Sequence, residues 1–279
     1  MPIPVPPAIV AEQVRLALAE DVGDGDRTAA LVPAGAVSGA VVICREPAVL
    51  CGAAWLDEVF RQLDTAVAVD WLAADGDAVP EGATLCRLRG PSRPLLTGER
   101  TALNFLQSLS GTATASRRWA EAVAGTGVQI LDTRKTIPGL RRAQKYAVTC
   151  GGCHNHRIGL FDALLIKENH IAAAGSVGSA LRAAHACAGG LEIEIEVESL
   201  GQLREALDAG ARRVLLDNFP LERVHEAVAL NAGRARLEAS GGVTLENVRA
   251  IAETGVNDIS VGVLTKHLRA IDLSMRFLP

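Results

Sequence analysis

The sequence predicts an α/β protein in which a TIM-like β/α barrel, complete or incomplete, follows a smaller N-terminal α/β sandwich domain. Three observations predict this fold. From about residue 125 onward, six short β-rich runs alternate with segments of helical periodicity. Each run ends in polar residues or glycine, and roughly the first 95 residues show instead strands joined by tight turns. Strands that alternate with helices pair in parallel through right-handed crossovers, so six units favour a barrel, although a doubly wound sheet has a similar pattern.

The N-terminal domain is expected over residues 1–110. Its first landmark is Leu18–Thr28, an acidic stretch broken by glycines that predicts a loop. The stretches Val37–Gly52 and Asp75–Leu88 combine β-forming residues with turn residues, which predicts strands joined by tight turns. These features are typical of a separate α/β or α+β domain, and the C-terminal tail, residues 268–279, is a candidate to pack with it.

A long helix is predicted to link the two domains, with Thr97 as its N-cap and Glu99 in its first turn. The residues on its predicted apolar face are Ala102, Phe105, Leu106, Leu109 and Ala113. The domain boundary is placed along this helix, and the barrel domain is expected over residues 111–267.

The barrel domain contains six predicted strands. They are Val128–Thr133, Ala163–Asn169, Leu191–Glu198, Arg213–Asn218, Arg236–Gly242 and Asp258–Val263. Two of the helices between them have recognisable starts. Ser199 followed by Gln202 forms a capping-box pattern, and Thr244 is a predicted N-cap.

Composition and charge limit the possible functions. The chain has 279 residues, a net charge of -4 and only 3% aromatic residues, so nucleic acid is not an expected partner. No run approaches the roughly 18–20 apolar residues of a membrane helix, so no membrane association is expected. The N-terminal stretch MPIPVPPAIV has prolines where a signal peptide has an apolar core, and it has no basic lead-in. We therefore expect a cytoplasmic protein.

Polar residues and glycines stand at the carboxyl end of every predicted strand. Because the carboxyl ends of barrel strands meet on one face, where active sites of such folds lie, these residues predict a functional site. A single polar strand end is commonly only a surface position, but six together favour a site. The residues are Thr133, Arg134, Lys135, Lys167, Glu168, Asn169, Glu196, Glu198, Asp217, Asn218, Ser240, Gly241, Gly242 and Gly262.

The charge pattern predicts an anionic ligand of small size. From Thr133 to Phe161 there is no acidic residue, and six residues are basic. Of these six, Arg141, Arg142 and Lys145 have helical spacing, so we interpret them as a solvated helix face. The remaining basic residues, Arg134, Lys135 and Arg157, are candidates for anion binding, with His156 beside the last.

The residue types suggest a division of roles. Arginine can grip both oxygens of a carboxylate, whereas lysine suits phosphate as a point charge. Ser240, Gly241 and Gly242 precede a predicted helix and can offer backbone N–H groups to a phosphate. Glu196 and Asp217 supply oxygen ligands for magnesium and partners for sugar hydroxyls. The alternative for these two carboxylates is a structural ion pair with Lys135 or Lys167.

A CxxCH pattern spans Cys150–His154 and raises a competing interpretation. This pattern attaches haem in c-type cytochromes, and its thiols could also bind zinc or form disulfides. Haem attachment and stable disulfides belong mostly to exported proteins, so the expected cytoplasmic location argues against both. Zinc stays open on these grounds.

Eight stretches carry a family resemblance. They are EDVGDGDRT from Glu20, ERTALNFLQSLSGTAT from Glu99, LDTRKTIPGLRRAQKYAV from Leu131, GGCHNHRIGLFDALLIKENHI from Gly151, EIEVES from Glu194, LLDNF from Leu215, LEASGGV from Leu237 and ISVGVLTKH from Ile259. In this order they closely resemble the quinolinate phosphoribosyltransferase family, also called nicotinate-nucleotide pyrophosphorylases (carboxylating). One departure is Cys153, which stands where many members have a glycine.

The resemblance implies a reaction and a set of site residues. Quinolinate and phosphoribosyl pyrophosphate would give nicotinate mononucleotide, pyrophosphate and carbon dioxide, a step of NAD biosynthesis, with magnesium and no organic cofactor. The implied quinolinate ligands are Arg134, His156, Arg157 and Lys167, with Arg100 from a second subunit. The implied residues for the phosphoribosyl donor are Lys135, Glu196, Asp217, Ser240, Gly241, Gly242 and Gly262. Lys135, Lys167, Glu196 and Asp217 are the implied catalytic residues, and Glu196 and Asp217 the implied magnesium ligands.

The resemblance also implies a homodimer or a higher oligomer with shared active sites, because Arg100 would act across an interface. The nearest alternative is a paralogue from a molybdate transport system that acts on another anionic substrate. Retention of the HNHR segment and of Arg100 favours the quinolinate enzyme. A metal- or haem-binding module that uses Cys150, Cys153, His154 and His156 is a second alternative.

Overall fold

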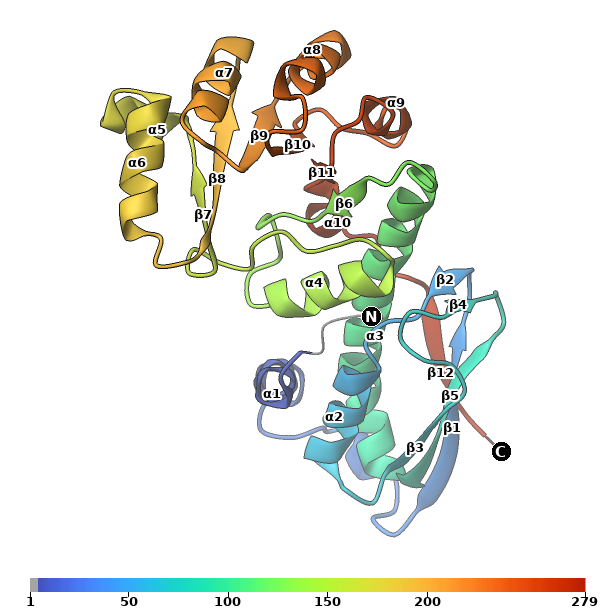
Figure 1. Ribbon diagram of the computed structural model, residues 1–279. Coiled ribbons are helices and arrows are strands. Elements are labelled where there is room, and N and C mark those ends of the chain that lie inside the picture. The colour runs from blue at the N-terminus through green and yellow to red at the C-terminus, as the bar shows by residue number, and fades with distance from the viewer. Residues whose placement is uncertain (1–4, 279) are drawn as a thin grey trace. The chain divides into compact units, whose positions relative to one another are not determined.

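The computed structural model describes residues 5–278, which form two compact units (Figure 1). The first unit comprises the described residues up to Arg117, Thr136–Gly152 and the described residues from Leu264 onward. The second comprises Arg118–Lys135 and Cys153–Val263. The division falls inside the long helix α3 (Ser92–Ala122), along which the sequence places a domain boundary. Residues 136–152 belong to the first unit, although the sequence analysis assigns them to the barrel domain.

An antiparallel sheet of four strands forms one layer of the first unit. In sheet order, its strands are β12 (Leu273–Phe277), β1 (Val37–Cys44), β5 (Thr84–Pro91) and β3 (Ala68–Trp71). Two short strands, β2 (Ala48–Val49) and β4 (Ala78–Val79), form a separate antiparallel pair. The last strand of the chain, β12, pairs with β1, so a C-terminal strand completes the sheet of the first unit.

Helices and the core complete the first unit. Its helices are α1 (Pro7–Val22), the single 3-10 turn Ala29–Leu31, α2 (Ala53–Leu63), the part of α3 up to Arg117 and α4 (Arg141–Cys150). Helix α1 packs against α2. The core contains Trp55 and Phe60 of α2 and Leu106 of α3, each at most 1% exposed. Because α1 extends to Val22, the acidic loop predicted from Leu18 begins only at Gly23.

The second unit contains a parallel sheet of six strands, which confirms all six strand predictions for the barrel domain. In sheet order they are β6 (Gln129–Leu131), β11 (Asp258–Ser260), β10 (Arg236–Ser240), β9 (Arg213–Asp217), β8 (Glu192–Val197) and β7 (Ala163–Ile166). Within residues 5–278, no ladder joins β6 to β7, and β6 instead makes a single parallel bridge between Leu131 and His154. The sheet is therefore barrel-like but is not closed by hydrogen bonds between its two edge strands.

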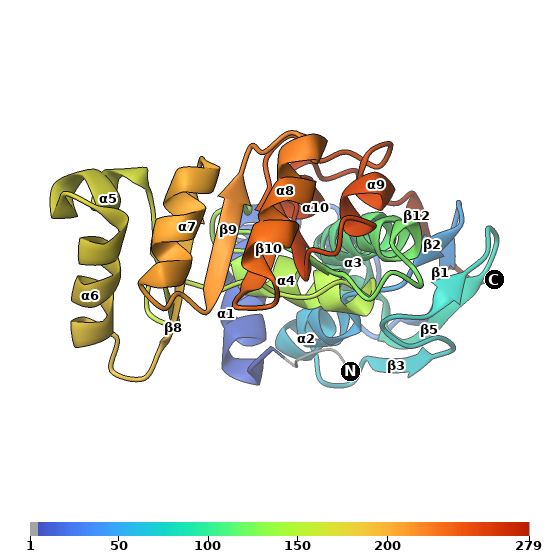
Figure 2. The same ribbon diagram turned by 45° about the horizontal axis from the view of Figure 1, so that its top comes forward.

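Helices follow the strands of the second unit and lie outside the curved sheet (Figure 2). They are α5 (Glu168–Ala174), α6 (Val177–Cys187), α7 (Leu200–Asp208), α8 (Leu221–Asn231) and α9 (Val248–Ala252), and a short helix, α10 (Val263–Lys266), begins at the end of the unit. Helix α6 packs against β7 and β8, and α7 packs against β8. No helix of the described chain has both the length and the apolar character that crossing a bilayer requires.

The strands of this sheet alternate between an apolar and a polar face. Residues such as Ile195, Val214 and Ile259 are fully buried, as expected for the face that the helices cover. The residues between them in sequence, including Glu194, Arg213 and Glu238, bond to one another and so share the opposite face. The sheet therefore encloses charged groups where an apolar barrel core is the usual arrangement.

Helix starts were predicted with mixed success. Ser199 caps α7 as predicted, and its Oγ accepts a hydrogen bond of 3.2 Å from the Gln202 N–H. The reciprocal half of the predicted capping box is absent, because the Gln202 side chain accepts from the Glu198 N–H instead. Helix α3 begins at Ser92, so Thr97 is not its N-cap, and the Thr97 hydroxyl donates to Asp26 instead. Helix α9 is capped at Asn247 rather than Thr244, because the Asn247 side chain accepts from the Thr244 N–H and holds residues 245–247 in a turn.

The interpretation of α4 as carrying a solvated basic face is wrong for Lys145. This side chain is only 1% exposed, and it ranks among the largest fully buried side chains of the described residues. Arg141 and Arg142 are half-buried. The sequence spacing identified the helix correctly but could not show which of its residues are buried.

Candidate active site

The carboxyl ends of the parallel strands place the predicted site residues of the second unit on one side of the sheet. Arg134 and Lys135 follow β6, and Lys167 follows β7. Glu196 is the second-to-last residue of β8. The register of the next two strands pairs Asp217 of β9 with Ser240 of β10. In-register parallel strands bring these ends together, so residues far apart in sequence become neighbours.

Three cationic side chains converge on one cavity of about 470 Å³ in the second unit: Arg134, Arg157 and Lys167 line it together. Leu160 and Leu165 contribute an apolar wall. Burial and the charge of Arg134 lower the pKa of Arg157, which still lies far above neutral pH because guanidinium is so basic. A cavity with three cations and an apolar wall suits a small, flat, multiply charged anion.

Lys167 connects this cavity to the carboxylates. Its Nζ lies 2.6 Å from Oε2 of Glu196, whose side chain is only 10% exposed. For Glu196, an ion pair with a lysine was the predicted alternative to magnesium binding, and this ion pair is present. The same contact also places a carboxylate directly beside the cationic cavity.

The ends of β9 and β10 form a tight corner. The Asn218 N–H donates to the Ser240 carbonyl at 2.9 Å, and the Ser260 hydroxyl donates to Ser240 Oγ at 3.0 Å. Gly241 has φ of +89°, and a Cβ there would lie 2.6 Å from Cγ of Asn218. Only glycine fits this position, because the backbone conformation and the Asn218 side chain both exclude a larger residue.

Lys135 and Gly262 are neighbours at the ends of β6 and β11. A Cβ on Gly262 would lie 3.1 Å from Cδ of Lys135, so the lysine stem rests on the glycine. Lys135 thus reaches along the same edge of the sheet that carries the corner at Ser240 and Gly241. Arg100 belongs to α3 in the first unit and is exposed.

A buried ion network on the polar face of the sheet was not predicted from the sequence. Arg213 is its centre: its Nε donates to Glu194 at 3.0 Å, and its Nη2 donates to Glu238 at 2.7 Å and lies 3.4 Å from Asp258. The three carboxylates are 4% exposed or less. The available signal was the alternation in Glu192–Val197 and Arg236–Ser240, where every second residue is charged or polar inside a strand.

His156 joins this network to the cationic cavity. Its Nε2 lies 2.8 Å from Glu194 and 3.5 Å from Glu238. Burial lowers the pKa of His156, but the hydrogen bond to Glu194 and the charges of both carboxylates outweigh it, so the pKa is raised. The Arg157 N–H donates to Nδ1 at 2.7 Å. This hydrogen bond needs an unprotonated Nδ1, so it favours the neutral ring and opposes the rise in pKa. The contact with Glu194 holds the ring in either form.

The network shifts the pKa values of Glu194 and Glu238 in opposite directions. Burial raises the pKa of Glu194, but His156 and Arg213 outweigh burial, so the pKa is lowered. Burial and the charge of Glu194 raise the pKa of Glu238 to about 7. Consistent with this, Oε1 of Glu238 is buried and makes no hydrogen bond. The raised pKa of Glu238 therefore makes its charge sensitive to pH near neutrality.

This shift predicts a pH-dependent stability. A carboxyl whose folded pKa is raised stabilises the fold below its unfolded value, 4.5, and loses that contribution as the pH rises through about 7. Glu238→Gln is expected to remove this loss, which is on the order of 3 kcal/mol. The free energy of unfolding in urea, measured for both proteins at pH 5 and pH 8, should favour the variant more at pH 8. Glu222→Gln, at an exposed carboxylate of α8 outside the network, is the control, and a pH-independent difference for Glu238→Gln would contradict the assignment.

The CxxCH pattern does not behave as a unit. Cys150 ends α4 in the first unit, where its Sγ and potential ligand atoms of Cys51 and Asp75 lie within 4.8 Å of one another. Cys153 begins the next segment of the second unit. All six cysteines of the chain are free thiols. Asp75 is occupied by the N–H groups of Gly52 and Ala53 and by the Tyr146 hydroxyl, which gives this cluster a packing role at the start of α2.

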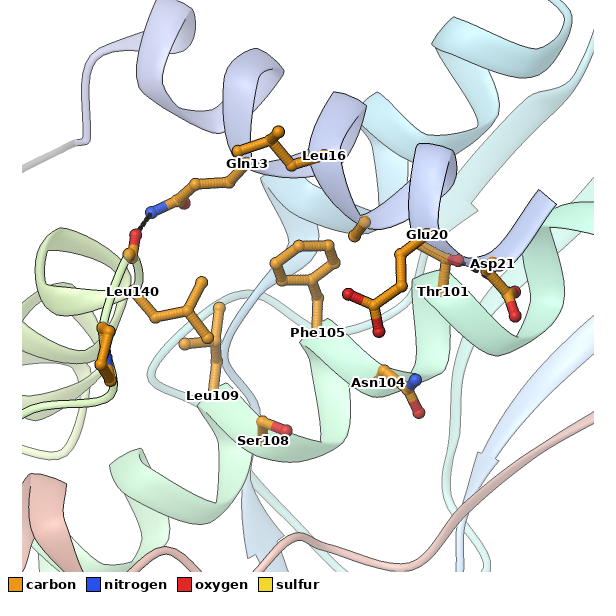
Figure 3. A pocket seen from close by; sticks show the side chains of 13 residues that line it. Gln13, Leu16, Glu20, Asp21, Thr101, Asn104, Phe105, Ser108, Leu109 and Leu140 are labelled. Atoms are coloured by element: carbon orange, nitrogen blue, oxygen red, sulfur yellow. Dashed lines mark hydrogen bonds between the residues drawn. The ribbon is translucent and has the colours of Figure 1, made fainter. Parts of the chain in front are cut away.

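A second cavity, of about 410 Å³, lies within the first unit (Figure 3). Side chains of α1 and α3 surround it, including Glu20, Phe105 and Leu109, and the 138–140 segment closes one end. Glu20 and Asp21 of the EDVGDGDRT stretch are its acidic groups, and none of its lining residues is basic. It therefore does not suit an anionic ligand, and no predicted site residue lines it.

The fold and the site define an α/β barrel-like protein with a cavity along its edge strand β7 that is lined by Arg134, Arg157 and Lys167. Two family models match the chain: "Quinolinate phosphoribosyl transferase, N-terminal domain" over residues 26–110 and "Quinolinate phosphoribosyl transferase, C-terminal domain" over residues 112–276. The chain belongs to the quinolinate phosphoribosyltransferase family.

Individual relatives agree with this assignment. A nicotinate-nucleotide pyrophosphorylase (carboxylating) of Mycobacterium leprae is 44% identical over 274 residues, 95% of each chain. A probable nicotinate-nucleotide pyrophosphorylase (carboxylating) of Bacillus subtilis is 42% identical over 257 residues, 92% of this chain and 89% of the relative. The solved structure of the nicotinate-nucleotide pyrophosphorylase from Francisella tularensis is 47% identical and has a TM-score of 0.96, covering 99% of this chain and 98% of that chain.

Proposed function

We propose that this protein is the enzyme that joins quinolinate to phosphoribosyl pyrophosphate and releases pyrophosphate and carbon dioxide, giving nicotinate mononucleotide for NAD biosynthesis. The observation that carries the proposal is the shared cavity of Arg134, Arg157 and Lys167 in a member of this family. Relatives along nearly the whole chain are named for this reaction, which favours it over the alternative of a molybdate-transport paralogue.

The dicarboxylate is assigned to the cationic cavity. Arg134 and Arg157 can each offer a planar pair of N–H donors to a carboxylate, and Lys167 adds a point charge. The apolar wall at Leu160 and Leu165 suits the flat face of a pyridine ring. Arg100 and His156 complete the set that the family resemblance implies.

The phosphoribosyl donor is assigned to the neighbouring strand ends. Backbone N–H groups at Ser240, Gly241 and Gly242 suit the 5-phosphate, and Lys135, resting on Gly262, suits the pyrophosphate.

Magnesium is assigned to Glu196 and Asp217. Oxygen ligands from these two neighbouring strands are of the kind that magnesium prefers, so this donor set fits the ion. When bound, it would neutralise charge on the pyrophosphate leaving group.

The chemistry follows from these positions. Breaking the bond to pyrophosphate develops positive charge on the ribose, which Glu196 and Asp217 can stabilise, and negative charge on the leaving group, which Lys135 can stabilise. The ring nitrogen of quinolinate is a weak nucleophile, so holding it in line with the sugar carbon supplies much of the rate. Once the nitrogen carries the ribose it is cationic, so it stabilises the carbanion left on the adjacent ring carbon when the 2-carboxylate departs as carbon dioxide. A proton from solvent then bonds to that carbon and gives nicotinate mononucleotide. No organic cofactor and no general base are required for these steps.

The direct test is to incubate the purified protein with quinolinate, phosphoribosyl pyrophosphate and magnesium chloride. Nicotinate mononucleotide and carbon dioxide are expected in equal amounts, with quinolinate labelled in its 2-carboxylate identifying the origin of the gas. Chelation with EDTA should stop the reaction, and activity that survives complete chelation would contradict the magnesium assignment. Absence of mononucleotide from folded protein would contradict the proposed function.

A shared active site predicts recovery of activity from two variants that are each nearly inactive at quinolinate concentrations close to the wild-type KM. If Arg100 acts in the partner's site, each subunit depends on its neighbour, and the functional unit is at least a symmetric dimer. Arg100→Ala and Arg157→Ala proteins, unfolded together and refolded, should recover up to about 25% of wild-type activity, because half of the dimers carry one intact site. The refolded single variants are the controls. No recovery in mixed dimers that sediment normally would show that Arg100 serves its own subunit.

We also place the enzyme in the cytoplasm. Six free thiols, five of them buried, suit a reducing compartment. Fractionation of cells that produce the protein, with a cytoplasmic and an exported marker, tests this location.

A further inference from the structure

The loop that carries Arg157 is held by side chains rather than by regular secondary structure. Four successive N–H groups donate to side-chain acceptors: that of His156 to Asp132 at 2.9 Å, that of Arg157 to His156 Nδ1 at 2.7 Å, and those of Ile158 and Gly159 to Asp162 at 2.7 and 2.9 Å. Satisfied backbone donors fix a loop that has no ladder of its own. The position of Arg157 therefore depends on the position of the His156 ring.

The ring is in turn held from the polar face of the sheet. Its Nε2 lies 2.8 Å from Oε2 of Glu194, a carboxylate that is only 4% exposed and does not line the cationic cavity. Oε1 of Glu194 accepts from Arg213 at 3.0 Å, so both of its oxygens are engaged and the carboxylate cannot turn away. With Nδ1 facing the Arg157 N–H, both ring nitrogens of His156 are directed at protein groups.

We propose that Glu194 is a positioning residue for the dicarboxylate site: its buried carboxylate orients His156, whose ring fixes the main chain at Arg157. This inference rests on the proposed function and refines the role of His156 within it. His156 contributes to quinolinate binding through the placement of Arg157, because its own nitrogens point to Glu194 and to the loop. The benefit is preorganisation, since an arginine held in place loses less freedom when the dicarboxylate binds.

The proposal predicts an effect on one substrate only. Glu194→Gln keeps the shape of the side chain but removes the charge and one acceptor, so it cannot satisfy both His156 and Arg213. The KM for quinolinate is expected to rise about tenfold, the loss of one charge-assisted hydrogen bond, and the KM for phosphoribosyl pyrophosphate to stay within about twofold. Because Glu196 lies on the same strand face, the donor KM is the necessary internal comparison.

Asp258→Asn is the matched control. Asp258 is a carboxylate of the same buried network, bonded to Arg236 and near Arg213, but it has no contact with His156. If Glu194 merely stabilised the fold, both variants would lower thermal stability and change both KM values in parallel. A quinolinate-specific rise in Glu194→Gln that Asp258→Asn lacks supports positioning, and equal changes in the two variants overturn it.

A double-variant cycle tests the route through His156. If Glu194 acts through the ring, Glu194→Gln combined with His156→Gln should raise the quinolinate KM no more than the stronger single change, whereas multiplying effects overturn the proposal. Should Glu194→Gln not fold, Glu194→Asp keeps the charge but withdraws the carboxylate from the ring, and the same criteria apply. Wild-type protein that makes no nicotinate mononucleotide refutes the proposed function. Active wild type with an unaltered quinolinate KM in the Glu194 variants refutes only this inference.

Discussion

Replacement of Arg157 by alanine is expected to raise the KM for quinolinate by about 100-fold, the largest effect on that substrate that we predict for a single residue. Arg157 lines the cationic cavity and faces Arg134 closely enough for the two charges to repel each other. A dianion relieves that repulsion as it binds, so the loss includes both the hydrogen bonds and the favourable charge interaction. Initial rates at saturating phosphoribosyl pyrophosphate measure the effect.

Stability and geometry provide the controls for this variant. Arg157 Nη1 also donates to the Ala163 carbonyl at 3.1 Å, so Arg157→Ala should cost only about 1 kcal/mol of folding free energy. Arg157→Lys keeps the charge without the planar fork and should raise the KM about tenfold. Arg249→Ala removes an exposed arginine of the second unit that pairs with Glu253, and it should leave the KM unchanged. An unchanged quinolinate KM in Arg157→Ala would remove the basis of the site assignment.

Replacement of Gly241 by alanine is expected to raise the KM for phosphoribosyl pyrophosphate at least about tenfold. The new methyl group would overlap the Asn218 side chain and lie 3.0 Å from the Asn218 backbone nitrogen, so the corner between β9 and β10 must open. Opening the corner moves the backbone N–H groups assigned to the 5-phosphate. The added left-handed strain alone costs roughly 1–2 kcal/mol.

The variant Gly242→Ala separates the effect of steric overlap with Asn218 from the effect of backbone strain. Gly242 also has a positive φ, +62°, but a Cβ there meets nothing within 4 Å. This variant should therefore show the cost of backbone strain with a smaller rise in the donor KM. Equal effects from the two alanines would mean that the contact with Asn218 does not shape the donor site.

The two variants together separate the two substrates. Arg157→Ala is expected to act on the quinolinate KM, and Gly241→Ala on the donor KM, because Arg157 lies on the loop before β7 whereas Gly241 directly follows β10. A variant that altered both constants equally would indicate a general loss of structure, which thermal unfolding of the same preparations would reveal.

Much of the second unit could be predicted from the sequence. Each β-rich run contains a strand, because β-branched and aliphatic residues followed by a glycine or polar turn are a local signal. The polar strand ends were recognised for the same reason. Lys145 shows the limit of such reasoning: its spacing on α4 is that of an exposed residue, and only the tertiary structure shows that it is buried.

The contacts that link Glu194 to His156 and His156 to Arg157 could not be predicted from the sequence either. Glu194 stands inside a strand, two residues before a predicted site residue, and nothing local distinguishes it from a surface glutamate. Its role depends on the inward face of the sheet, where Arg213 and Glu238 come from two other strands. Sequence alternation showed that one face was polar but could not show that it was enclosed.

By itself, the sequence determined the alternation of strands and helices, the polar carboxyl ends of the strands and the family to which the chain belongs, because these are properties of local residue order. Only the tertiary structure decided that Arg134, Arg157 and Lys167 share one cavity, that Lys145 is buried and that a carboxylate inside the sheet holds His156. The physical reason is that contacts between strands depend on pairing order and register, which bring together residues that are distant along the chain.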